Sequence, residues 1–158
     1  MVRVVYIALV AFLAIATAQQ VAEELPAEVP IEEIPTKAIA VESVEEFMRQ
    51  NPGVTLLEMK AEQRALTRYY TLGRRVSGDF YAAYARGTNS YGSPRFVSVR
   101  INYSGYIVTY IQVSVQQSSN SGRAYVVSGG IGQRSIGFIV EASSTTQFNY
   151  NADIYARK

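Results

Sequence analysis

The sequence predicts an all-β fold, an antiparallel β-sandwich or open barrel of six to seven strands, preceded by an acidic leader with one or two short helices. The first observation is a change of composition at residue 69, where Tyr, Val, Ile, Ser and Gly replace Glu and Pro. The second is alternation, because apolar residues at every second position indicate a strand with one buried face. It is clearest where Val97, Val99, Ile101 and Tyr103 alternate with Ser98, Arg100 and Asn102.

Turn signals divide this region into separate runs, each of a length typical of a strand. Ser104-Gly105 lies between two patterned runs and predicts a tight hairpin. Residues 69–72 are expected to add an edge strand. The six main runs are 78–85, 95–103, 106–116, 123–128, 134–142 and 148–157.

Residues 1–18 have the layout of a cleavable signal peptide, with one basic residue, an apolar stretch and small residues at its end. Cleavage is expected between Ala18 and Gln19. The apolar stretch is too short for a membrane span of about 20 residues, so no membrane span is expected. These features predict a secreted, extracellular protein.

The leader, residues 19–68, is rich in Glu and Pro, and its first part, 19–40, is expected to be extended and disordered. Ser43 and Glu46 are spaced as a capping box and predict a short helix. A second helix is expected within 54–66. The β domain then occupies residues 69–158.

The chain contains no His and no Cys, which removes the usual zinc ligands, the neutral-pH acid/base and the thiolate nucleophile. We therefore expect no enzyme, no cofactor and no metal. One enzymatic alternative stays open, a small glycan hydrolase that would need two facing carboxylates. The β domain offers Asp79, Glu141 and Asp153 for that role.

The two parts of the chain carry opposite charge. Residues 19–62 hold ten Glu against three basic residues, whereas residues 69–158 hold nine basic residues against three acidic ones. Eleven tyrosines are interleaved with arginines in the β domain, a mixture typical of recognition surfaces. Tyr106, Tyr110 and Arg100 are the candidate contact surface. An unknown protein or small-molecule ligand is the expected partner, and the lack of a dense basic cluster argues against nucleic acid.

Asn102-Tyr103-Ser104 is an N-glycosylation triplet at the predicted hairpin. A secreted chain would expose Asn102 to glycosylation if its side chain faces outward. Asn102 is therefore a candidate glycan site.

Two motifs resemble the multiprotein bridging factor 2 family of insects. The first opens the β domain with Gly73, Arg75, Gly78 and Asp79, and the second is the turn that contains Gly129, Gly130 and Gly132. Tyr110-Ile111 and the closing segment 154–157 extend the resemblance over residues 72–157. The resemblance implies a short secreted all-β protein. It also implies the role of the family's founding member, a co-activator that bridges a DNA-bound factor to the general transcription machinery.

These observations favour a secreted, non-enzymatic binding or interaction protein. The alternative is a transcriptional co-activator of the kind that the resemblance implies.

Overall fold

The strands of the protein form one antiparallel sheet that folds over on itself. The computed structural model describes residues 36–41, 43–64 and 67–158. The strands follow the order β1-β5-β8-β6-β4-β3, and β7 pairs with β8 and with β2. Their bounds are β1 Lys37–Ala40, β2 Leu57–Glu58, β3 Lys60–Arg64, β4 Thr67–Gly73, β5 Phe80–Ser104, β6 Ile107–Gln117, β7 Gly122–Gly129 and β8 Ser135–Arg157, and helix α1 is Val44–Gln50.

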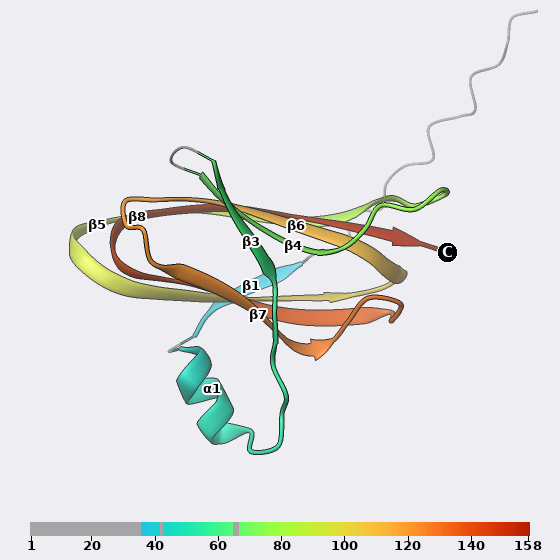
Figure 1. The fold of residues 1–158 in the computed structure, drawn as a ribbon, viewed down its shortest axis with the longest axis horizontal. Coiled ribbons are helices and arrows are strands. Elements are labelled where there is room, and N and C mark those ends of the chain that lie inside the picture. The colour runs from blue at the N-terminus through green and yellow to red at the C-terminus, as the bar shows by residue number, and fades with distance from the viewer. Residues whose placement is uncertain (1–35, 42, 65–66) are drawn as a thin grey trace, which may run out of the picture. The chain divides into compact units, whose positions relative to one another are not determined.

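Two long strands create the fold-over. The runs expected at 78–85 and 95–103 are the two halves of β5, and those at 134–142 and 148–157 are the two halves of β8. β5 and β8 pair with each other along both halves, and their register shifts around Arg95. Irregularities of this kind bend a strand pair. Both strands turn back at the same end of the molecule (Figure 1), which confirms an all-β fold built from one open sheet.

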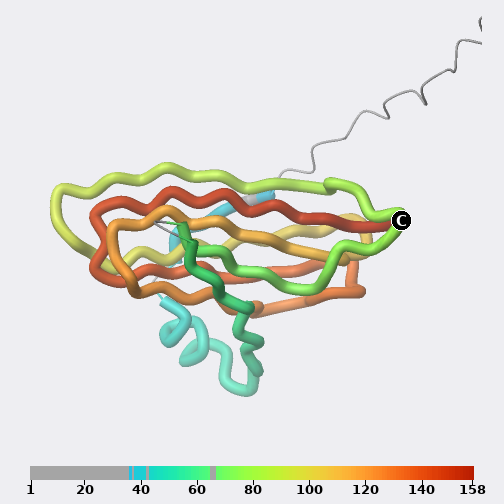
Figure 2. Tube along the Cα trace, turned by 45° about the horizontal axis from the view of Figure 1, so that its top comes forward, coloured from blue at the N-terminus to red at the C-terminus, as the bar shows by residue number. Residues whose placement is uncertain are grey.

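The fold-over produces two layers with the core between them (Figure 2). One layer contains the first half of β5, the second half of β8, β6, β4 and β3, and the other contains the second half of β5, the first half of β8, β7 and the short strands β1 and β2. The alternation predicted around Val99 is confirmed, because the side chains expected inside are buried. They are Val97, Val99, Ile101 and Tyr103.

Helix α1 covers the outer side of the second layer. It begins as the capping pattern predicts, with the Glu46 amide donating to Ser43 Oγ at 3.0 Å. Val44 and Phe47 pack against Val127 and Ile139. This position explains why the outward residues of that layer are not all exposed.

The second helix expected within 54–66 is wrong, because the described residues of this segment form β2 and β3 instead. Leu57 pairs with Val126 of β7, and Lys60–Arg64 pairs with β4. Met59 between them is buried. Strand partners outweigh a weak helical pattern here, as tertiary contacts commonly do. Part of the expected disordered stretch, Lys37–Ala40, also pairs with β5, whereas the predicted signal peptide at 1–18 and residues 19–35 lie outside the described residues.

Candidate functional site

Four tyrosines gather on the outer side of the first layer, on three neighbouring strands. We call Tyr81, Tyr84, Tyr110 and Tyr155, together with Arg86, the tyrosine face. Tyr155 of β8 is paired in register with Tyr110 of β6 and with Tyr81 of β5. The Tyr155 ring centroid lies 5.9 Å from that of Tyr110 and 5.5 Å from that of Tyr81. Cross-strand aromatic pairs of this kind stabilise a sheet surface.

Arginines lie over two of these rings. The guanidinium carbon of Arg75 is 3.7 Å from the Tyr155 ring centroid, and that of Arg86 is 4.7 Å from the Tyr84 ring centroid. Tyr81 stacks on Tyr84 with centroids 6.5 Å apart. The arrangement is a continuous surface of aromatic rings and guanidinium groups, the side chains most enriched where proteins bind one another.

Hydrogen bonds hold the hydroxyls of Tyr81 and Tyr110 in place. The Tyr81 hydroxyl donates to Asp153 Oδ1 at 3.0 Å, and the Tyr110 hydroxyl donates to Gln112 Oε1 at 3.1 Å. Burial, followed by the contact with the Asp153 carboxylate, raises the pKa of Tyr81 to about 12. The phenol of Tyr81 is therefore neutral at physiological pH.

The loop between β4 and β5 supports one end of the tyrosine face, and it contains the first family motif. Asp79 accepts hydrogen bonds from Arg75 Nε and from the Val76 amide at 2.9 Å each, and from Thr109 Oγ1 at 3.1 Å. Its side chain is only 2 % exposed. Asp79 thereby fixes Arg75 against Tyr155. The motif residues are a structural clamp.

Gly73 of the same motif is required by its backbone. Its φ is +75°, and a Cβ at this position would lie 2.3 Å from the Thr109 carbonyl oxygen. Gly78 also has a positive φ, of +80°. Gly73 and Gly78 therefore allow the β4–β5 loop to follow the path that places Arg75 over the Tyr155 ring.

Replacement of Asp79 by Asn is expected to destabilise the fold in a pH-dependent way. The hydrogen bond from Arg75 is the main cause that lowers the pKa of Asp79 from 3.8 to about 2. Because the folded-state pKa is lowered, its contribution to stability is present above about pH 4 and is lost as the pH falls towards 2. Urea midpoints of wild type and Asp79→Asn should thus differ at pH 6 and converge towards pH 2.

The matched control is Glu58→Gln, which neutralises an exposed carboxylate that forms no ion pair with the residues described. This variant should keep the wild-type midpoint at pH 6. A midpoint for Asp79→Asn equal to wild type at pH 6 would show that the clamp contributes nothing.

A shallow hollow continues the tyrosine face along the sheet. It has a volume of about 350 Å³ and is lined by side chains of four strands, among them Tyr69, Arg86, Ser114 and Asn151. Arg86 Nε donates to Asn151 Oδ1 at 2.7 Å and thus lies across the rim of this hollow. The face therefore combines aromatic rings with hydrogen-bonding groups over much of one layer.

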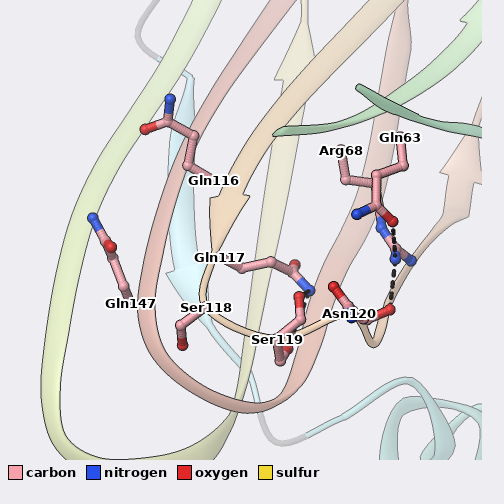
Figure 3. Close-up of a pocket in the computed structure, with 8 residues that line it drawn as sticks. All are labelled: Gln63, Arg68, Gln116, Gln117, Ser118, Ser119, Asn120 and Gln147. Atoms are coloured by element: carbon pink, nitrogen blue, oxygen red, sulfur yellow. Dashed lines mark hydrogen bonds between the residues drawn. The ribbon is translucent and has the colours of Figure 1, made fainter. Parts of the chain in front are cut away.

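A second polar hollow, of about 380 Å³, lies at the end of the molecule where β6 leads into β7 (Figure 3). Arg68 crosses it and donates to the carbonyl oxygens of Asn120 and Gly122 at 2.6 and 2.8 Å. Gln117 Nε2 donates to the carbonyl oxygens of Ser119 and Ser121. These side chains close the β6–β7 loop. The lining consists of amides, hydroxyls and one arginine, without a carboxylate.

The predicted contact residues lie on three different parts of the fold. Tyr110 belongs to the tyrosine face. Tyr106 lies at the β5–β6 hairpin, where its ring meets Phe80 with centroids 5.1 Å apart. Arg100 lies in the other layer, with its guanidinium carbon 5.2 Å from the Phe47 ring centroid of α1. The structure therefore does not bring these three side chains together.

Sequence reasoning missed Tyr81, Tyr84, Tyr155 and Arg86 as members of the tyrosine face. A register shift between Tyr81 and Ala83 interrupts the alternation, so the pattern could not show that Tyr81 and Tyr84 share a side. Strand pairing brings Tyr155 to Tyr110 across 45 positions of sequence. The one available signal was the outward position of Tyr110 in its run.

Two of the carboxylates considered for a glycan hydrolase, Asp79 and Glu141, lie in different parts of the fold. Asp79 is bound by Arg75 and Thr109 beside Tyr155, whereas Glu141 lies in the other half of β8. Glu141 accepts from Arg123 Nε at 3.0 Å and from the Val44 amide at 3.2 Å, and it anchors α1. Asp153 accepts from Tyr81 on the tyrosine face.

Further expectations concern a metal site and a membrane span in the described part of the chain. It contains no group of three or more His, Cys, Asp or Glu residues placed to hold a metal ion, and no helix in it is both long and apolar enough to cross a membrane.

Asn102 lies within β5 between β1 and β8, where its Oδ1 accepts from Arg100 Nε at 3.0 Å. Its glycosylation stays a prediction. Gly129, Gly130 and Gly132 form the β7–β8 turn.

Comparison with known proteins gives one match. A family model described as "Transcription activator MBF2" matches residues 72–156. The matched segment includes the β4–β5 loop, the tyrosine face and the β7–β8 turn. No curated protein and no solved structure matches the chain.

This match corrects the expected function and location. A secreted, extracellular binding protein was expected, but the matching family is described as a transcription activator, whose action is on gene expression inside the cell. The expectation of an extracellular binding protein is therefore wrong. It depended on residues 1–18, which lie outside the described residues.

Proposed function

Because the chain belongs to the MBF2 family of transcription activators, we propose that it is a non-enzymatic transcriptional co-activator that works by binding other proteins through its tyrosine face. In this role it links a DNA-bound factor to the general transcription machinery. The observation that carries the proposal is the surface of Tyr81, Tyr84, Tyr110 and Tyr155 with their arginines, which lies within the family segment.

The physical character of the tyrosine face suits protein binding. Tyrosine and arginine offer large contact areas that combine apolar contact with hydrogen bonding. Here the clamp of Asp79 on Arg75 and the hydrogen bonds of the phenols hold the side chains before any partner arrives, which reduces the entropy lost on binding. Helix α1 packs on the other layer, so it leaves this side uncovered (Figure 1).

The non-enzymatic part of the proposal is supported by the chemistry available. The chain has no His and no Cys. Asp79 and Glu141 are each held by an arginine and have structural tasks. Neither is poised as a general acid or base.

The test is a reporter assay with the full chain fused to a heterologous DNA-binding domain. The wild-type fusion should raise transcription from the reporter. The double change Tyr84→Ala with Arg86→Ala should lower activation at least about fivefold, because it removes one ring and one guanidinium group from an interface surface. Both side chains are exposed, so the fold should persist.

The matched control is Arg95→Ala with Phe96→Ala, an exposed arginine and aromatic residue at the bend of β5. This control should retain wild-type activation. The proposal fails if the wild-type fusion, present in the nucleus, leaves the reporter unchanged. Its assignment to the tyrosine face fails if the control loses as much activity as the double variant.

A further inference from the structure

A second surface, separate from the tyrosine face, surrounds the exposed side chain of Ile131 in the β7–β8 turn. Two hollows of about 420 and 450 Å³ adjoin there, and Ile131 lines both. Val76, Ile107 and Val108 line the first, and Leu57, Leu72 and Val126 are among those that line the second. We call these two hollows, with Arg74 and Arg157 at the edge of the first, the Ile131 groove.

The groove exposes two aliphatic side chains. Leu57 is 56 % exposed and Ile131 is 41 % exposed, although 24 buried residues form the main core nearby. Adjacent exposed aliphatic side chains above apolar hollows are typical of protein interaction sites.

The turn that carries Ile131 is held rigidly. The Gly132 amide donates to the Val108 carbonyl oxygen and the Val108 amide donates to the Gln133 carbonyl oxygen, both at 2.8 Å. The Gly105 amide donates to the Arg134 carbonyl oxygen at 2.7 Å. Ile131 therefore keeps its position without a partner, and binding would not need to order the turn.

Charge indicates what this groove accepts. Arg74 and Arg157 line the first hollow, and neither forms an ion pair with a described residue. The three acidic residues of 69–158 have other partners, because Asp79 binds Arg75, Glu141 binds Arg123 and Asp153 binds Tyr81. The groove therefore joins an apolar floor to a positive edge that nothing described neutralises. An occupant that carries both aliphatic side chains and carboxylates would match the apolar floor and the positive edge.

We propose that the Ile131 groove binds an extended segment of a partner protein in which aliphatic residues are flanked by Asp or Glu. Aliphatic side chains two positions apart lie on the same side of an extended chain, about 7 Å apart. Two such side chains fill the two hollows on either side of Ile131, and the flanking carboxylates meet Arg74 and Arg157. This interaction is additional to the proposed function and uses different residues.

The experiment is a fluorescence polarisation titration of the full chain with a labelled seven-residue peptide. The peptide has two leucines separated by one glutamate and flanked by two glutamates on each side. Saturable binding is expected. The double change Arg74→Gln with Arg157→Gln, and separately Ile131→Ser, should each weaken binding at least about fivefold. Raising the salt concentration should also weaken it, because charged edges are screened.

Matched controls separate this groove from unspecific charge attraction. Arg95→Gln removes a positive charge at the bend of β5 and should leave binding unchanged. A peptide with serine in place of both leucines should bind at least about fivefold more weakly. If Ile131→Ser does not fold, as judged by circular dichroism, Leu57→Ser replaces it, since Leu57 is 56 % exposed.

The inference is overturned if the leucine peptide does not bind, if Arg95→Gln weakens binding as much as the double change, or if the serine peptide binds equally well. None of these results concerns reporter activation. A failed titration with an active reporter removes only the groove, whereas an inactive reporter with intact peptide binding removes only the proposed function.

Discussion

The change Gly129→Ala should lower the free energy of unfolding by about 3 kcal/mol or more, because it combines a left-handed backbone with a direct backbone collision. Gly129 has φ +65°, and a Cβ there would lie 2.0 Å from the Ser135 carbonyl oxygen. That oxygen accepts the hydrogen bond from the Gly130 amide that closes the turn. The turn must therefore open to admit a methyl group. Urea unfolding followed by circular dichroism measures the loss.

The adjacent glycine provides the control. A Cβ at Gly130 would meet nothing within 4 Å, and its φ lies outside the left-handed region. Gly130→Ala should change stability by less than about 0.5 kcal/mol. Equal urea midpoints for the two alanine variants would show that the β7–β8 turn can adopt another conformation at little cost.

The change Phe138→Ala should cost about 3–5 kcal/mol, the usual range for removal of a buried aromatic side chain. Phe138 is fully buried in the first half of β8, paired in register with Ile101 of β5 and Val126 of β7. Its ring fills space between the layers, and the backbone around it is held on both sides by neighbouring strands. The cavity left by alanine therefore cannot collapse easily.

Phe96→Ala is the matched control, because Phe96 is 39 % exposed at the bend of β5. Its loss should cost less than about 1 kcal/mol. The protein contains no tryptophan and eleven of its twelve tyrosines lie in the region from Tyr69 onward, so tyrosine fluorescence can follow both variants. If Phe138→Ala unfolds at the same urea concentration as Phe96→Ala, the two layers do not pack as described.

The strands of the β domain were predictable because alternation is a local property. The alternation around Val99 predicted one buried face of a strand. The structure buries all four side chains of that face, which are Val97, Val99, Ile101 and Tyr103. The cap of α1 was equally local, since Ser43 and Glu46 are three residues apart. In contrast, the sequence pattern of residues 57–64 does not indicate strands. These residues form β2 and β3 because they pair with β7 and β4.

The tyrosine face could not be predicted from the sequence of any single strand, because it depends on how neighbouring strands pair. Tyr110 and Tyr155 meet because β6 and β8 pair in one register, and a shift of one residue would turn one of them inward. Tyr81 joins them only because a register shift interrupts the β5 alternation. The role of Asp79 in holding Arg75 could not be predicted either, because its hydrogen bond from Thr109 joins residues 30 positions apart in the sequence.

The all-β class, the buried face around Val99, the N-terminal cap of α1 and, through the glycine motifs, the family could all be predicted from the amino-acid sequence. Those features depend on residues close together in the chain. Three features became visible only in the folded protein: single long strands bend to form both layers, four tyrosines share a surface, and Ile131 is exposed where two hollows adjoin. Each of these follows from strand register and from contacts between residues far apart in sequence, which local composition does not specify.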